Sequence, residues 1–206
     1  MSYRIKFYRL FNVLLAILIL GGVAYAAEKD AARTLDEALA DLAKGGSVIL
    51  MRHANSPSGQ LASVGMTEGC VLGEGRGLDA KGFFQARFIG EFLKSENVPI
   101  GMAYTSDMCR TWDTARLVAA GAPVETAPEL KTTNVGEIDL FKQRLAARLS
   151  EHKKENILLV THSNIVPLYS DWESEGEIPS GVVLIVDPKQ WTIRDKLNLD
   201  VDLSVD

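Results

Sequence analysis

Two histidines and two arginines occupy positions in this sequence where a sheet could bring them together. His53 and His162 each follow a run of apolar residues closely, Arg52 stands directly before the first histidine, and Arg110 stands at the start of a predicted helix. Arginine stays cationic at any working pH, and its planar fork of donors matches phosphate oxygens. A histidine held neutral by neighbouring positive charge is nucleophilic near neutral pH, and a second histidine can donate a hydrogen bond to a phosphoryl oxygen. The four residues together indicate covalent phosphoryl transfer.

The elements that must position these side chains are strands and helices in alternation. Continuous apolar runs, typical of strands covered on both faces, occur at 47–51, 156–160 and 182–186. Shorter strands are expected at 102–106 and 123–126, and an edge strand at 191–198. Amphipathic helices are expected at 28–44, 80–95, 109–120 and 138–152. The alternation predicts one α/β domain with a largely parallel sheet, whose ligands bind beyond the carboxyl ends of the strands.

Polar residues beside the two histidines are candidates for binding the substrate. Asn55 follows the first histidine by two residues, and Ser163 and Asn164 directly follow the second. Because the carboxyl ends of parallel strands meet at one edge of a sheet, all three are expected near the same ligand.

The first 26 residues have the pattern of a secretory signal peptide. Basic residues (Arg4, Lys6 and Arg9) precede an apolar stretch at 10–23, and small residues at 24 and 26 suit a signal peptidase. The apolar stretch is shorter than the roughly 20 residues that span a bilayer. We therefore expect a signal peptide at 1–26 and a domain at 27–206 that is periplasmic or otherwise exported. The alternative is an uncleaved anchor facing the periplasm, with membrane contact through this segment alone.

The two cysteines, Cys70 and Cys109, are expected to form a disulfide. Export permits disulfides, and an even number of cysteines favours pairing. The bond would tie the loop after the first histidine to the segment that carries Arg110. Two unrelated thiols are the alternative.

Composition and charge exclude several classes of function. The net charge is -5 and the isoelectric point is near 5.3, so the chain has no basic footprint for nucleic acid. An anionic ligand must therefore be held by a local cluster of cations. No grouping of histidine, cysteine and carboxylate has metal-ligand spacing, so we expect no metal and no other cofactor. The expected partner is a small-molecule or surface-bound phosphoester.

Four segments, in order along the chain, resemble the histidine phosphatase superfamily, which includes the phosphoglycerate mutases. They are Arg52-His53-Ala54 for the family's Arg-His-Gly, the Leu-x-x-x-Gly-x-x-Gln-Ala segment at 78–86, Ser106 with Arg110, Thr114 and Ala115, and the Thr-His-Ser-Asn segment at 161–164. The resemblance covers roughly residues 47–170 and implies a three-layer α/β/α sandwich with a mostly parallel central sheet. It also implies that His53 is the nucleophile and that Arg52, Arg110 and His162 line the phosphate pocket.

The proton donor is where this sequence departs from the family. Mutase-like members carry a glutamate two residues after a leucine at the end of the third strand, and here Thr132 stands at that position. The acid-phosphatase branch has an aspartate directly after the second histidine, where this chain has Ser163. Glu137 is the nearest substitute, although a glutamate at a helix N-terminus is also favoured by the helix dipole alone. Glu129 and Asp107 are further candidates.

Export, the paired cysteines and the segment at 134–138 resemble a periplasmic branch of small bacterial phosphatases. That branch includes the phosphatases of heptose phosphates in the lipopolysaccharide core. We expect an exported phosphomonoesterase that forms a phosphohistidine on His53. The alternatives are a phosphate-binding protein of the same fold that has lost its acid, and a phosphoglycerate mutase-like phosphotransferase.

Overall fold

The computed structural model describes residues 33–57, 65, 70, 76–173 and 177–199 of the 206-residue chain. The chain divides after Thr34, and Leu35–Asp206 form one compact unit. The predicted signal peptide and its boundary after residue 26 lie outside the described residues. Within those residues, no helix combines the length and the apolar character needed to cross a bilayer.

A single six-stranded sheet forms the centre of this unit. Its strands are β1 (Val48–Arg52), β2 (Ile100–Thr105), β3 (Val124–Thr126), β4 (Asn156–Thr161), β5 (Val183–Val186) and β6 (Ile193–Leu197). The order across the sheet is β3-β2-β4-β1-β5-β6, with the first four strands parallel. β5 pairs antiparallel with β1 and with β6. The mostly parallel sheet and the edge position of β6 agree with the sequence prediction.

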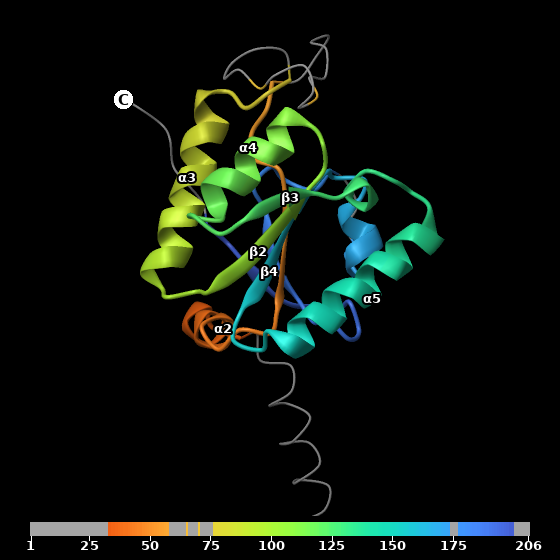
Figure 1. Cartoon of the computed structure of the whole chain (residues 1–206). Helices are drawn as coiled ribbons and strands as arrows, with labels where there is room; N and C mark the ends of the chain where they lie inside the picture. The colour runs from red at the N-terminus through yellow and green to blue at the C-terminus, as the bar shows by residue number, and fades with distance from the viewer. Residues whose placement is uncertain (1–32, 58–64, 66–69, 71–75, 174–176, 200–206) are drawn as a thin grey trace, which may run out of the picture. The chain divides into compact units, whose positions relative to one another are not determined.

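Helices cover both faces of the sheet, which makes the fold a three-layer α/β/α sandwich. One face packs against α2 (Leu35–Leu42), α3 (Ala80–Ser95) and α4 (Cys109–Val118). The other packs against α5 (Val135–Glu151) and two short 3₁₀ helices, η2 (Pro128–Leu130) and η3 (Val166–Tyr169). Figure 1 shows α3 and α4 on one side of the strands and α5 on the other.

The apolar strands are explained by this double cover. In β1, Ile49 and Met51 belong to the core beneath α3 and α4, whereas Val48 and Leu50 belong to the core beneath α5. All four side chains are fully buried. A strand with a core on each face needs apolar residues at every position, which is why the run shows no alternation.

Helix boundaries follow the capping residues. α3 begins at Ala80, as predicted, because the Asp79 side chain accepts a hydrogen bond from the Gly82 amide at 2.7 Å. α5 begins at Val135 rather than at residue 138, because Asn134 accepts from the Gly136 amide at 3.1 Å and caps the helix earlier. The first predicted helix is also shorter than expected within the described residues, since α2 begins at Leu35.

Candidate phosphate site

His53 lies at the carboxyl end of β1, where it is buried and oriented by two backbone contacts. Its amide donates to the Thr161 carbonyl at 2.9 Å, which continues the pairing of β1 with β4. Its ring Nδ1 lies 2.8 Å from the Ala54 carbonyl oxygen. A carbonyl only accepts hydrogen bonds, so Nδ1 carries the hydrogen and Nε2 keeps its lone pair. The ring is therefore held in the tautomer of a nucleophile.

The environment of His53 keeps its imidazole neutral. Burial is the largest cause and lowers the pKa of His53 to about 3, and the hydrogen bond to Ala54 acts in the opposite direction. The positive charges of Arg110 and Arg52 add to the lowering, as does the neighbouring ring of His162. The sequence predicted the direction of this shift but attributed it to neighbouring charge. The structure corrects the cause, because burial outweighs the arginines.

His162 faces His53 from the end of β4. The two ring centroids are 5.5 Å apart with their planes at 67°. Nε2 of His162 lies 2.9 Å from the Ser106 hydroxyl, and Nδ1 lies 3.4 Å from Nη2 of Arg110. Burial first, then Arg110, lowers the pKa of His162 to about 4. One ring nitrogen of His162 thus contacts the Ser106 hydroxyl, and the other lies beside the Arg110 guanidinium.

Hydroxyl groups attach the start of α4 to both histidine segments. The Ser106 and Thr111 hydroxyl oxygens are 2.7 Å apart. The Thr114 hydroxyl donates to the Arg110 carbonyl at 2.7 Å and accepts from the Ala54 amide at 3.0 Å. These buried contacts fix the backbone of Arg110 relative to the residue that follows His53.

Three arginines place positive charge around the two histidines. Nη2 of Arg52 forms an ion pair with Glu177 at 2.6 Å, and Nη1 donates to the Ile178 carbonyl. Within the described part of the chain, the buried Nε of Arg52 and that of Arg76 have no hydrogen-bond acceptor. Burial, Arg76 and Arg52 together lower the pKa of Arg110 to about 10, so it remains cationic near neutral pH. Buried donors without acceptors are costly unless a ligand satisfies them.

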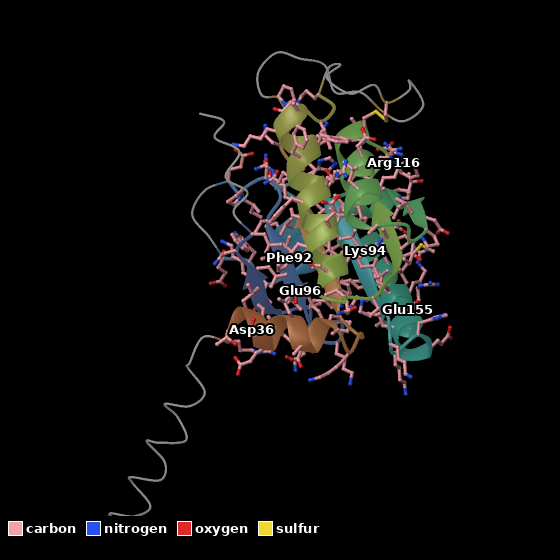
Figure 2. All side chains as sticks on the ribbon, turned by 90° about the vertical axis from the view of Figure 1, so that its left-hand side faces the viewer. Asp36, Phe92, Lys94, Glu96, Arg116 and Glu155 are labelled. Carbon is pink, nitrogen blue, oxygen red and sulfur yellow. A yellow bond between two sulfur atoms is a disulfide. The ribbon has the colours of Figure 1, made fainter. Side chains whose placement is uncertain are left out.

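The disulfide between Cys70 and Cys109 is formed, as the sequence predicted, with the two Cα atoms 5.3 Å apart. Cys109 is the first residue of α4 and directly precedes Arg110. Figure 2 shows the yellow sulfur–sulfur bond near the start of α4, at the opposite end of the unit from Asp36 on α2. The bond therefore attaches residue 70 to the helix end that carries a site arginine.

The three polar residues predicted to bind substrate lie beside the histidines in the chain but differ in their contacts. The Asn55 side-chain amide donates to the Asp79 carboxylate at 2.6 Å, and the Asn55 backbone amide donates to the Gln85 side chain at 3.0 Å. Asn55 therefore joins the His53 loop to α3. Ser163 and Asn164 lie in the turn after His162, half-buried and exposed respectively. Their role in binding substrate stays a prediction.

Glu137 lies in the first turn of α5, where its carboxylate accepts from the Asn134 side chain at 3.0 Å. It is exposed, in a surface groove that it shares with Glu129, Leu140 and Arg144. Among the described residues, neither His53 nor His162 forms a side-chain hydrogen bond with Glu137. Its assignment as the proton donor stays a prediction, and its observed partner is the residue that caps its own helix.

The sequence model of the histidine phosphatase superfamily (branch 1) matches residues 48–148 of this chain. This span contains Arg52, His53 and Arg110. The chain belongs to the histidine phosphatase superfamily. No curated protein sequence matches the chain.

Two solved structures are similar to this chain, and the likeness to the first shows the fold. The protein histidine phosphatase SixA complexed with tungstate is 19% identical, covers 73% of this chain and 96% of its own, and superposes with a TM-score of 0.54. Phosphoglycerate mutase from Thermus thermophilus is 23% identical, covers 75% of this chain and 99% of its own, and has a TM-score of 0.46.

Three residues of this candidate site were not singled out from the sequence as site residues. Ser106, which holds His162, was already visible as the first residue of the Ser-x-x-x-Arg segment. Arg76 stands two residues before Leu78 of another matched segment, so a cation so close to the motif was a usable signal. Glu177 gave no signal, because its contact with Arg52 joins residues 125 positions apart.

Metal binding has no visible basis in the described ranges. Nowhere in them do three or more histidine, cysteine or acidic side chains gather as a metal site would require.

Proposed function

We propose that this protein is an exported phosphomonoesterase that transfers a phosphoryl group to His53 and then to water. One observation carries the proposal: His53 is neutral, its Nδ1 is tied to the Ala54 carbonyl, and its ring faces His162 among arginines. A neutral nucleophile beside fixed cations is the arrangement that phosphoryl transfer needs, because the transferred group carries its negative charge on the equatorial oxygens.

The reaction proceeds in two displacements. The Nε2 lone pair of His53 attacks phosphorus, the bond from phosphorus to the ester oxygen breaks, and the leaving oxygen takes up a proton. Water then attacks the phosphohistidine, the phosphorus–nitrogen bond breaks, and phosphate leaves while water loses a proton. Arg52, Arg76 and Arg110 offset the charge of the phosphoryl oxygens in both steps. His162, held through Nε2 by Ser106, positions its Nδ1 beside Arg110.

The test is hydrolysis of 4-nitrophenyl phosphate by the full-length protein without added metal. This ester has a good leaving group, so turnover depends little on the proton donor. We expect turnover that His53→Ala abolishes, and an acid-quenched reaction should contain phosphate bound to His53 in the parent protein only. Absence of both turnover and phosphohistidine would contradict the proposal.

A phosphate-binding protein without turnover is the second candidate. Its support is the absence of a carboxylate at Thr132 and at Ser163, together with the engagement of Glu137 by Asn134. It predicts that inorganic phosphate raises the melting temperature while 4-nitrophenyl phosphate is not hydrolysed.

The compartment is part of the proposal. The signal-like segment at 1–26 and the disulfide between Cys70 and Cys109 both support export to the periplasm or beyond. Fractionation of cells that express the full chain tests this, and retention in the cytoplasm with both cysteines reduced would contradict it. A phosphoester of the outer cell surface, such as one in the lipopolysaccharide core, is within reach of an exported enzyme.

A further inference from the structure

A carboxylate stands at the edge of the cationic site. Glu177 forms its 2.6 Å ion pair with Arg52, yet 70% of the Glu177 side chain is exposed, against 13% for Arg52. The arginine thus points into the protein while its acidic partner faces the solvent from which a substrate arrives.

The position of Glu177 is fixed by the backbone around it. The Ile178 carbonyl accepts from Arg52, the Ser180 carbonyl accepts from Gln85 at 2.9 Å, and the Gly181 amide donates to the His53 carbonyl at 3.1 Å. Gly181 has a φ of +74°, and a Cβ there would stand 2.4 Å from the Gln85 side chain. The segment 177–181 is therefore attached directly to the loop that carries the nucleophile.

A second carboxylate lies on the other side of the site, after β2. Asp107 directly follows Ser106, and its side chain, 62% exposed, pairs with Lys131 at 3.0 Å. Both charges act electrostatically on His162, since Lys131 lowers the pKa of His162 and Asp107 raises it. Asp107 and Lys131 also line a groove with Thr126, Pro128 and Thr132.

Two exposed carboxylates stand at the outer edge of the charges around the histidines. Among the described side chains, Arg52 pairs with the carboxylate of Glu177, and Lys131 pairs with that of Asp107. A second anionic group on the substrate, close to its phosphate, would approach these two outer carboxylates, and the cation beside each of them is already paired.

We propose that the site selects phosphomonoesters whose organic part is uncharged or cationic near the phosphate, and that Glu177 is the main residue that sets this preference. The inference rests on the proposed function, because it concerns the substrate of the same site. Glu177 is expected to act more strongly than Asp107, because its partner is a buried arginine of the pocket, whereas Asp107 pairs with Lys131, which is exposed. Phosphoglycerates, which carry a carboxylate next to the ester, are disfavoured on this basis.

Three two-carbon esters that differ mainly in the charge of their far end test the preference: phosphoethanolamine, ethyl phosphate and phosphoglycolate. Dissociation constants are measured by calorimetry at low ionic strength on full-length protein with His53→Ala, which prevents turnover. We expect phosphoglycolate to bind about fivefold or more weakly than ethyl phosphate, and phosphoethanolamine to bind at least as tightly. Added salt should reduce the difference, because Glu177 is exposed.

Glu177→Gln, in the same His53→Ala background, should bring phosphoglycolate to within about twofold of ethyl phosphate. Glu173→Gln is the matched control, since Glu173 is an exposed acid of the same connection and makes no contact with the site within the part of the chain that the structure describes. It should leave the difference unchanged. Equal binding of all three esters by the His53→Ala protein would overturn the proposal. So would an unchanged difference between phosphoglycolate and ethyl phosphate after Glu177→Gln.

The experiment separates this inference from the proposed function. Both sets of constants are obtained from a variant without turnover, so they hold whether or not the parent hydrolyses esters. Loss of hydrolysis with the charge preference intact would contradict only the phosphatase assignment. Hydrolysis of 4-nitrophenyl phosphate without any charge preference would contradict only the inferred substrate preference, including the role of Glu177.

Discussion

Both ends of the sheet bury polar side chains, but the two ends differ in whether the protein supplies hydrogen-bond partners for them. At the end where β4 begins, Asn156 is fully buried and its amide is satisfied by the chain itself. Its oxygen accepts from the Ser47 amide at 3.1 Å, and its nitrogen donates to the carbonyls of Leu42 and Pro99 at 2.8 and 3.0 Å. At the other end, the buried Nε groups of Arg52 and Arg76 find no acceptor in the described residues.

This difference distinguishes a structural polar group from a functional one. A buried amide with three internal partners gains stability from the fold and has nothing left for a ligand. Buried guanidinium donors without acceptors reduce stability in the free protein and recover that loss when an anion arrives. Substitutions at the two ends should therefore change different measurable quantities.

The largest expected effect is on activity at the histidine end. His53→Ala removes the nucleophile and should lower kcat for 4-nitrophenyl phosphate by about 10⁴-fold or more. The free energy of unfolding, measured in urea, should fall by much less than the activation free energy for hydrolysis rises, because the neutral buried ring contributes little to the stability of the fold. A variant that retained a tenth of the activity would show that His53 is not the nucleophile.

The second effect is on stability at the opposite end. Asn156→Ala leaves the Ser47 amide without its acceptor and removes one of two donors from the carbonyls of Leu42 and Pro99, so it should cost about 3 kcal/mol in free energy of unfolding. The kcat of the folded variant should stay within about twofold of the parent, because the site lies at the other end of β4. A large loss of kcat with unchanged stability would overturn the contrast between the two ends.

The third effect tests the arginine that the sequence did not single out. Arg76→Ala should lower kcat/KM by about 100-fold, since it removes a fixed charge from the phosphoryl site. It should also weaken the rise in melting temperature that inorganic phosphate produces. Arg116→Ala is the control, because Arg116 is exposed on α4 and pairs with Asp113 instead. Equal effects of the two substitutions would remove Arg76 from the site.

The smallest effect, taken for each residue, is the pH dependence of stability. The pKa values of His53 and His162 are lowered from 6.5 to about 3 and about 4, so below about pH 6.5 the unfolded chain binds protons that the folded chain does not. Stability is therefore full above the unfolded pKa and falls as the pH decreases toward the folded values. Between about pH 7 and 5 each histidine should contribute a loss of about 2 kcal/mol.

Urea unfolding of the parent and of His53→Gln at both pH values measures this contribution. The variant should lose about 2 kcal/mol less than the parent on acidification. Equal losses in the two proteins would show that His53 titrates normally in the folded state. Asn156→Ala should leave the pH dependence unchanged, which separates the two ends again.

Local features of the sequence were sufficient for most of the fold. The bounds of α3 were predicted to the residue, because Asp79 is a standard N-cap and the apolar spacing is regular. α5 was predicted three residues late, because the cap at Asn134 was not used. The antiparallel direction of β5 also escaped prediction, since a continuous apolar run does not encode strand direction. A parallel neighbour of β1 would need a crossover, and the described residues between η3 and β5 include no crossover helix.

The sequence by itself determined which residues stand at the strand ends. His53, Arg52, His162 and the segment of Arg110 are set by apolar runs, caps and motif spacing, all of which act over a few residues. The tertiary structure alone decided how these groups behave. Burial of the imidazoles, the approach of Arg76 to Arg110 and the pairing of Arg52 with Glu177 depend on surfaces assembled from distant parts of the chain. The free energy of a charge depends on everything packed around it, and that environment exists only after folding.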